Sequence, residues 1–105
     1  MPNVLILTDR NDFPHAIVRG EPLPSGVTIR VSSRRSAGAG GRWLMKVDLR
    51  LISGPAFAMW LLRKVRSIGG HHQVEIGGVV MPQHMPEAID VIAESVVNSR
   101  LKAAA

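Results

Sequence analysis

The sequence predicts an α+β protein, built as a two-layer sandwich of a four-stranded, mainly antiparallel sheet with two helices packed on one face. Three observations support this class. Residues 4–7 form a continuous apolar run that is typical of a strand. Residues 42–72 begin with strand-like alternation and continue, after Ser53-Gly54-Pro55, with the spacing of an amphipathic helix. A second stretch with helical spacing follows residue 86.

The first strand and the segment after it decide between two topologies. Residues 4–7 are apolar at every position, which predicts a central strand buried on both faces. Residues 10–25 are interrupted by prolines and glycines, which predicts an irregular connection. A helix over residues 11–19 would instead produce the β-α-β-β-α-β order of a degenerate ferredoxin-like fold plus a C-terminal helix, and this is the alternative. Pro14 and the shortness of the segment argue against that helix.

Three further strands are predicted. Residues 27–32 and 42–52 alternate in polarity and are joined by a loop at residues 33–41 (SRRSAGAGG), which we expect to be flexible. Together they form a hairpin with a basic tip. Residues 73–80 form the fourth strand, in which Gly77-Gly78 indicates a bulge or a close backbone approach.

The two helices have recognisable ends. Ser53 or Gly54 caps the first helix, Pro55 lies in its first turn, and Gly69-Gly70 ends it. The second helix runs from about residue 86 to 102, and residues 103–105 are expected to fray. The element order is therefore β-β-β-α-β-α, and residues 1–105 form one domain.

Composition narrows the class of protein. A chain of 105 residues with 46% hydrophobic residues is long enough for one core, and the absence of cysteine excludes disulfides and thiolate metal sites. We expect a cytoplasmic protein without a membrane partner, because the sequence contains no long apolar run and no signal-peptide pattern. The formal net charge is +5, and ten of the 13 basic residues are arginine, a side chain suited to phosphate and carboxylate recognition.

A basic surface on the predicted hairpin is the first candidate site. The alternation places five polar side chains on the solvent face of the sheet: Thr28, Arg30, Lys46, Asp48 and Arg50. We expect the anion-binding residues to be Arg30, Arg34, Arg35 and Arg42. Such a cluster could engage an anionic partner, either nucleic acid or an acidic protein. The alternative is an ordinary solvated face, since Asp48 lies among the cations and no aromatic residue is available for base stacking.

The border of the first helix is the second candidate, a protein-interaction site formed by Trp60, Arg63 and Arg66. Exposed tryptophan, methionine and arginine are enriched where proteins meet. This site predicts a protein-interaction or assembly subunit, including a homo-oligomer. The alternative is that Trp60 packs its ring against the sheet edge with Lys64 lying over it.

The histidines are candidate metal ligands, since His15, His71, His72 and His84 could meet if their loops lie at the same edge. Adjacent residues of a strand point to opposite faces, so His71 and His72 cannot both bind one ion unless Gly70 bends the chain. Met81, His84 and Met85 have soft-ligand character but also fit a loop that packs onto the second helix. We therefore expect no metal.

No catalytic signature is present. Asp9, Asp12 and His15 could perform acid–base chemistry if they met in a pocket, but Asp and Pro are also common where a chain leaves a strand. The sequence lacks the phosphate-binding, nucleophile and metalloprotease motifs. We expect a small basic binding module without enzymatic activity and without a cofactor, whose ligand the sequence does not identify.

Overall fold

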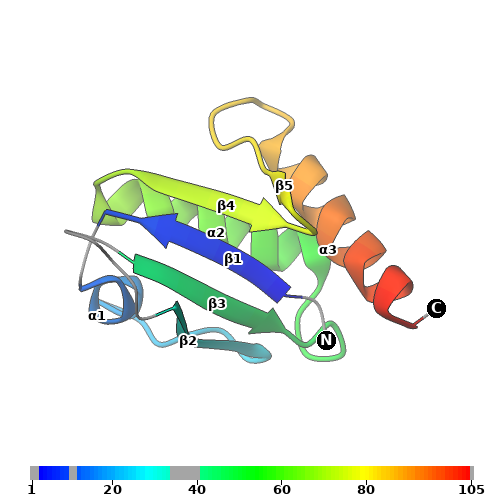
Figure 1. Ribbon diagram of the computed structural model, residues 1–105, viewed down its shortest axis with the longest axis horizontal. Helices are drawn as coiled ribbons and strands as arrows, with labels where there is room; N and C mark the ends of the chain where they lie inside the picture. The colour runs from blue at the N-terminus through cyan, green and yellow to red at the C-terminus, as the bar shows by residue number, and fades with distance from the viewer. Residues whose placement is uncertain (1–2, 10–11, 34–40, 105) are drawn as a thin grey trace.

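The structure, a computed structural model, describes residues 3–9, 12–33 and 41–104 and shows an antiparallel sheet with helices (Figure 1). The strand order is β2-β3-β1-β4-β5. The elements are β1 (Asn3–Thr8), α1 (Phe13–Ile17), β2 (Val27–Ser33), β3 (Gly41–Val47), α2 (Gly54–Ile68), β4 (His72–Ile76), β5 (Val79–Val80) and α3 (Ala88–Ala104). The α+β class and the antiparallel sheet are confirmed. The described sheet has five strands and not four, and a short helix, α1, is described in addition to the two predicted helices.

β1 lies in the centre of the sheet, paired antiparallel with β3 on one side and β4 on the other. Val4 and Ile6 point toward the helices and are fully buried. Leu5 and Leu7 point to the opposite face and are only half-buried, so β1 is not buried on both faces as the apolar run predicted. In Figure 1, α2 lies against the first face, and no helix in the described part of the chain crosses the second.

β3 ends at Val47, so the predicted strand over residues 42–52 is five residues too long. The Asp48 N–H donates to the Gly26 carbonyl at 2.7 Å, and the Asp48 carbonyl accepts from the N–H groups of Leu51 and Ile52 at 2.9 and 3.2 Å. These bonds form a turn. Apolar residues still alternate through the turn, which is why the pattern overran the strand.

The predicted strand over residues 73–80 is a hairpin. β4 and β5 pair with Ile76 opposite Val79, and Gly77 and Gly78 are the two turn residues between them. Their φ angles are +62° and +81°. Positive φ at both central positions is the geometry of the tight turn that fits strand twist, and glycine adopts it without strain. Gly77-Gly78 therefore marks a turn and not a bulge.

α1 is a single short helix in the segment expected to be irregular. Pro14 lies in its first turn, where the missing N–H has no intrahelical partner, and the Asp12 carbonyl accepts from His15 and Ala16. The element order from β1 to β4 is thus β-α-β-β-α-β, the order of the alternative topology. β5 and α3 follow it.

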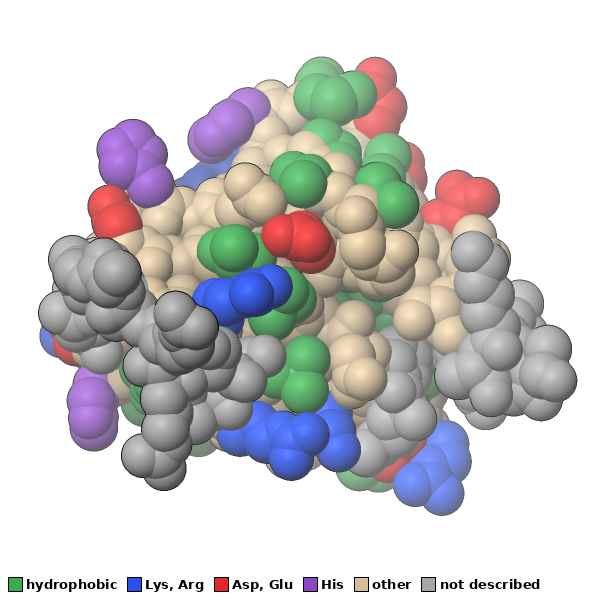
Figure 2. All heavy atoms as spheres, viewed as in Figure 1, with side chains coloured by type: hydrophobic (Ala, Val, Ile, Leu, Met, Phe, Trp, Pro, Cys, Tyr) green, Lys and Arg blue, Asp and Glu red, His purple; other side chains and the backbone are tan. Residues whose placement is uncertain are grey.

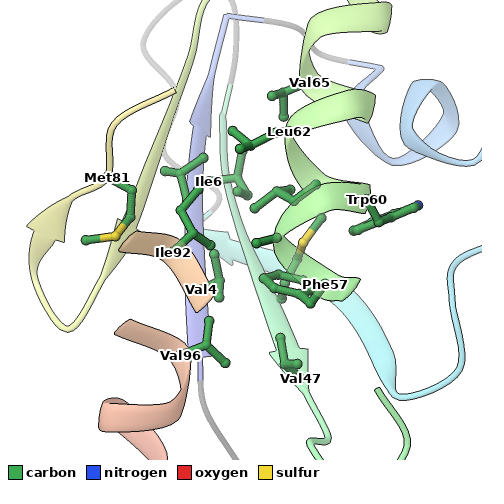
Figure 3. Close-up of a cluster of buried hydrophobic side chains, with 14 of the residues drawn as sticks. Val4, Ile6, Val47, Phe57, Trp60, Leu62, Val65, Met81, Ile92 and Val96 are labelled. Atoms are coloured by element: carbon green, nitrogen blue, oxygen red, sulfur yellow. The ribbon is translucent and has the colours of Figure 1, made fainter. Parts of the chain in front are cut away.

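The core lies between the sheet and the helices. Ser53 begins α2, since its Oγ accepts the Ala56 N–H at 3.2 Å, and Gly69 ends it with φ +72°. Side chains from β1, α2 and α3 converge there (Figure 3), including Val4, Ile6, Phe57, Leu62, Ile92 and Val96. Among the described helices none is long and apolar enough to cross a bilayer.

Candidate functional site

A groove runs between the outer side of α2 and the start of α3, with the connection from β5 to α3 along one edge. Its volume is about 990 Å³. The lining residues are Ala56, Met59, Trp60, Leu62, Arg63, Arg66, Ser67, His84, Met85, Pro86, Ala88 and Ile89. We call it the α2–α3 groove.

The chemistry of the α2–α3 groove is apolar with a basic rim. Met59 and Met85 are 58% and 50% exposed, although large apolar side chains are usually buried. Methionine is flexible and polarizable, so such side chains adapt to the shape of a ligand. The charged or titratable lining residues are Arg63, Arg66 and His84, and no lining residue is acidic.

The walls of the groove are fastened by polar contacts. Arg66 Nη2 donates to the Gln83 carbonyl at 2.8 Å, and Gln83 Nε2 donates to the His72 carbonyl at 2.7 Å. Met81 is buried in the core beneath the same loop. These contacts join the loop to α2 and to β4, so the groove has walls before any ligand binds.

The basic edge of α2 is partly neutralised within the chain. Glu21 Oε1 lies 3.0 Å from Arg63 Nη2 and 3.3 Å from Lys64 Nζ. Lys64 Nζ also donates to the Arg19 carbonyl at 3.2 Å, and the residue is only 7% exposed. Lys64 therefore anchors the segment between α1 and β2. Arg66 has no ion pair with any described residue, so it supplies the available charge at the rim.

The three predicted protein-interaction residues, Trp60, Arg63 and Arg66, all line the groove. Trp60 is only 6% exposed, and its ring centroid lies 6.0 Å from that of Phe57. The indole packs into the core, which agrees with the alternative of an inward-packed ring and not with an exposed tryptophan. Met59 and Met85 supply the exposed apolar surface instead.

The uncovered side of the sheet, here called the open face, is the second surface. The strand register places Arg30, Arg42 and Lys46 on it, around Leu44 on β3. None of these three cations has an ion pair with any residue in the described part of the chain. The predicted anion-binding residues Arg34 and Arg35 lie outside the described residues.

Asp48 and Arg50 do not belong to the open face, because β3 has already ended. Arg50 Nε and Nη2 donate to Asp48 Oδ1 and Oδ2 at 3.0 and 2.9 Å. This bidentate hydrogen bonding and the nearby negative charge raise the pKa of Arg50. The charge of Arg50 is thus balanced locally, and the prediction that both residues lie on the strand face is wrong.

Apolar side chains occupy the middle of the open face. Leu5, Leu7 and Leu44 are half-buried there, with Glu75 on β4 beside them. Figure 2 shows hydrophobic side chains in the centre of this face, basic ones toward β2 and β3, and an acidic one toward β4. Alternation within each strand does not predict this cluster, because it does not contain the register that aligns the three strands.

The histidines do not converge. The His71 N–H donates to Asp9 Oδ1 at 3.0 Å, while the His72 ring faces Phe13 at 5.8 Å between centroids. His72 Nε2 lies 2.6 Å from the Gly69 carbonyl oxygen. No group of three potential ligands among His, Asp and Glu occurs within the described ranges.

The candidate acid–base residues are also used locally. The Asp9 N–H donates to the His71 carbonyl at 3.2 Å, so Asp9 holds the connection to β4 through two hydrogen bonds. Asp12 precedes α1 and lies 4.0 Å from Arg19, and His15 is exposed on α1. Neither Asp9 nor His15 lines the α2–α3 groove.

The soft-ligand cluster separates in the same way. Met81 is 5% exposed and belongs to the core, whereas His84 and Met85 line the groove. The second interpretation of this loop, packing against the last helix, agrees with these positions.

Two surfaces in the described part of the chain combine solvent-accessible apolar side chains with cations that have no ion pair there: the α2–α3 groove and the open face. No protein-family model, curated protein or solved structure matches this chain.

Proposed function

We propose that this protein is a binding module without catalytic activity, whose α2–α3 groove holds an apolar, acidic helical segment of a partner protein. The observation that carries the proposal is the composition of the groove. It joins exposed methionines to a rim of cations and contains no acidic lining residue.

The apolar floor supplies affinity. Met59 and Met85 are solvent-exposed in the free protein, and covering apolar surface contributes about 25 cal/mol per Å². A groove between two helices fits the apolar face of an amphipathic helix, whose anchors recur at every third or fourth position. Leu62 and Ala88 are buried lining residues, against which such anchors would pack.

The rim supplies the sign of the partner's charge. Arg66 has no carboxylate partner among the described residues, and a partner carboxylate would give its guanidinium an ion pair in addition to the hydrogen bond to the neutral Gln83 carbonyl. Complementary charge mainly accelerates association and excludes partners of the wrong sign. A partner segment with lysines in place of glutamates is therefore disfavoured.

Two synthetic helical peptides test this proposal. They share leucine anchors and differ only in flanking residues, glutamate in one and lysine in the other. Methyl NMR of the methionines reports the site, and we expect the acidic peptide to shift Met59 and Met85 but not Met45, which is fully buried under the sheet. Arg66→Glu should weaken that binding by about tenfold. Equal affinity for both peptides, or unmoved Met59 and Met85 signals, would contradict the proposal.

Nucleic-acid binding at the open face is the second candidate function. Arg30, Arg42 and Lys46 favour it, since they share one face without internal ion pairs among the described residues. Neutralising Arg34, Arg35 and Arg42 together should lower affinity for DNA and reduce the slope of log affinity against log salt by about 0.9 per lost phosphate contact. An unchanged slope would remove this candidate.

A further inference from the structure

One row of side chains crosses the open face from strand to strand. The register aligns Arg30 on β2 with Leu44 on β3, Leu44 with Leu5 on β1, and Leu5 with Glu75 on β4. The row therefore reads cation, leucine, leucine, anion. Neighbouring strands are about 4.8 Å apart, so Arg30 and Glu75 are separated by about 14 Å within one chain.

The charged ends of the row are Arg30 on β2 and Glu75 on β4. Neither Arg30 nor Glu75 forms an ion pair with another residue that the structure describes. Gln73 Nε2 donates to Glu75 Oε2 at 3.0 Å, which orients the carboxylate, and its other oxygen has no hydrogen bond from the described residues. The leucines between them are half-buried, although the corresponding positions on the covered face, Val4 and Ile6, are completely buried.

A half-turn makes this row complementary to itself. We propose that the open face is the interface of a homodimer, with the twofold axis parallel to the strands and passing between β1 and β3. Leu5 of one copy then faces Leu44 of the other, and Arg30 of each copy faces Glu75 of its partner. Because a twofold interface uses the same patch twice, two ion pairs flank four leucines.

The flanking rows agree with the same axis. Register pairs Asn3 with Lys46 and Leu7 with Arg42, so across the interface Lys46 faces an amide and Arg42 faces an aliphatic side chain. No like charges meet among the described side chains. An axis perpendicular to the strands would instead place Arg30 against Arg30, so the charges select the parallel axis. Face-to-face sheets pack with strands aligned to within about 30°, which preserves this pairing.

Charge exchange combined with sedimentation equilibrium tests the interface. We expect the wild type to be a concentration-dependent dimer. Arg30→Glu and Glu75→Arg should each raise the dimer dissociation constant by at least about tenfold, because each places like charges together twice. The double variant should restore the constant to within about threefold of the wild type.

Lys46→Glu is the matched control, since it makes the same change in net charge on the same face but meets Asn3. It should change the dissociation constant much less than Arg30→Glu does. Arg66→Glu, in the α2–α3 groove, should leave dimerisation intact and thereby separates this interface from the proposed function.

Three results would overturn the homodimer. The first is a monomeric wild type up to its solubility limit. The second is a dimer that both single exchanges leave unchanged, or that the double exchange fails to restore. The third is a monomer whose DNA binding is weakened by Arg30→Glu and strengthened by Glu75→Arg, which would assign the face to nucleic acid.

Discussion

The two faces of the sheet differ sharply although they alternate along the same strands. On β1, Val4 and Ile6 have no exposed surface beneath the helices, while Leu5 and Leu7 are half-buried on the open face. The covered face is apolar and closely packed (Figure 3). The open face mixes leucines with charges (Figure 2). One face forms the core, and the other leaves leucines and charged side chains accessible to solvent.

The charged side chains of the two faces also differ in whether they have a partner within the described residues. Lys64, beside the covered face, is bound by Glu21 and by the Arg19 carbonyl. Arg30 and Glu75, on the open face, have no ion partner among the described residues. A basic residue in this chain is therefore available to a partner only if the fold has not already paired it.

The largest expected effect tests whether the covered face dominates stability. Ile6→Ala should lower the free energy of unfolding by about 3–4 kcal/mol, because it removes a fully buried side chain and leaves a cavity. Leu5→Ala, its neighbour on the open face, should cost about 1 kcal/mol. Urea unfolding followed by tryptophan fluorescence, at a concentration where the protein is monomeric, measures both. Equal losses would contradict the division between the faces.

The next effect concerns the contact between Gly26, just before β2, and Asp48, just after β3. This contact marks where the paired part of both strands stops. Gly26 has φ +90°, and a Cβ there would lie 2.9 Å from the Asp48 carbonyl oxygen and from Leu51 Cβ. Gly26→Ala should cost about 2–3 kcal/mol from strained φ and crowding together.

Gly20→Ala is the control for this turn. Gly20 has nearly the same φ, +87°, but no atom lies within 4 Å of its added Cβ. Thermal unfolding should show a loss of about 1 kcal/mol from φ alone. A Gly26 variant no worse than this control would show that the turn relaxes and does not define the edge of the sheet.

A smaller loss of stability than at Gly26 is expected when a charge that is ion-paired within the protein is removed, and a smaller one still when the charge has no ion pair among the described residues. Glu21→Gln should lower the free energy of unfolding by about 1–2 kcal/mol, because it removes the negative charge that pairs with the buried Lys64 ammonium. The loss stays this small because Glu21 is partly exposed, so water screens the ion pair. Arg30→Gln should change stability of the monomer by less than about 0.5 kcal/mol. If Arg30→Gln cost as much in chemical unfolding, Arg30 would have an internal structural role.

The smallest expected effect is at the start of α2, which covers the sheet. Ser53→Ala removes the hydrogen bond from the Ala56 N–H and should cost about 1 kcal/mol. Ser25→Ala, at an exposed turn, should stay within about 0.5 kcal/mol. Differential scanning calorimetry compares them, and equal melting temperatures would show that the cap contributes nothing measurable.

Local patterns predicted much of the fold. Alternation located β2 and the start of β3, and Ser53, Pro55 and Gly69 located α2. The hairpin between β4 and β5 was detectable in principle, because two glycines between apolar residues favour a tight turn. The end of β3 was not, because hydrogen bonds of Asp48 terminate the strand while the apolar alternation continues.

The candidate surfaces were less predictable. Arg63 and Arg66 were identified with a protein-interaction site, and the structure places them on the rim of the α2–α3 groove. The spacing left open whether Trp60 is exposed or packs its ring inward, and the structure shows it buried, since helical spacing specifies an angle around the helix and not the depth of neighbouring elements. The contribution of Met85 depends on the loop before α3, whose position is set by Arg66 and Gln83.

The sequence by itself determined the class of fold, the main periodic elements and the excess of positive charge, because these depend on local spacing and composition. Only the tertiary structure decided which charges are paired and which side chains share a row. Arg30, Leu44, Leu5 and Glu75 are far apart in the chain, and strand register alone aligns them. Register depends on hydrogen bonds between strands and on burial of one face, so a pattern within a single strand does not contain it.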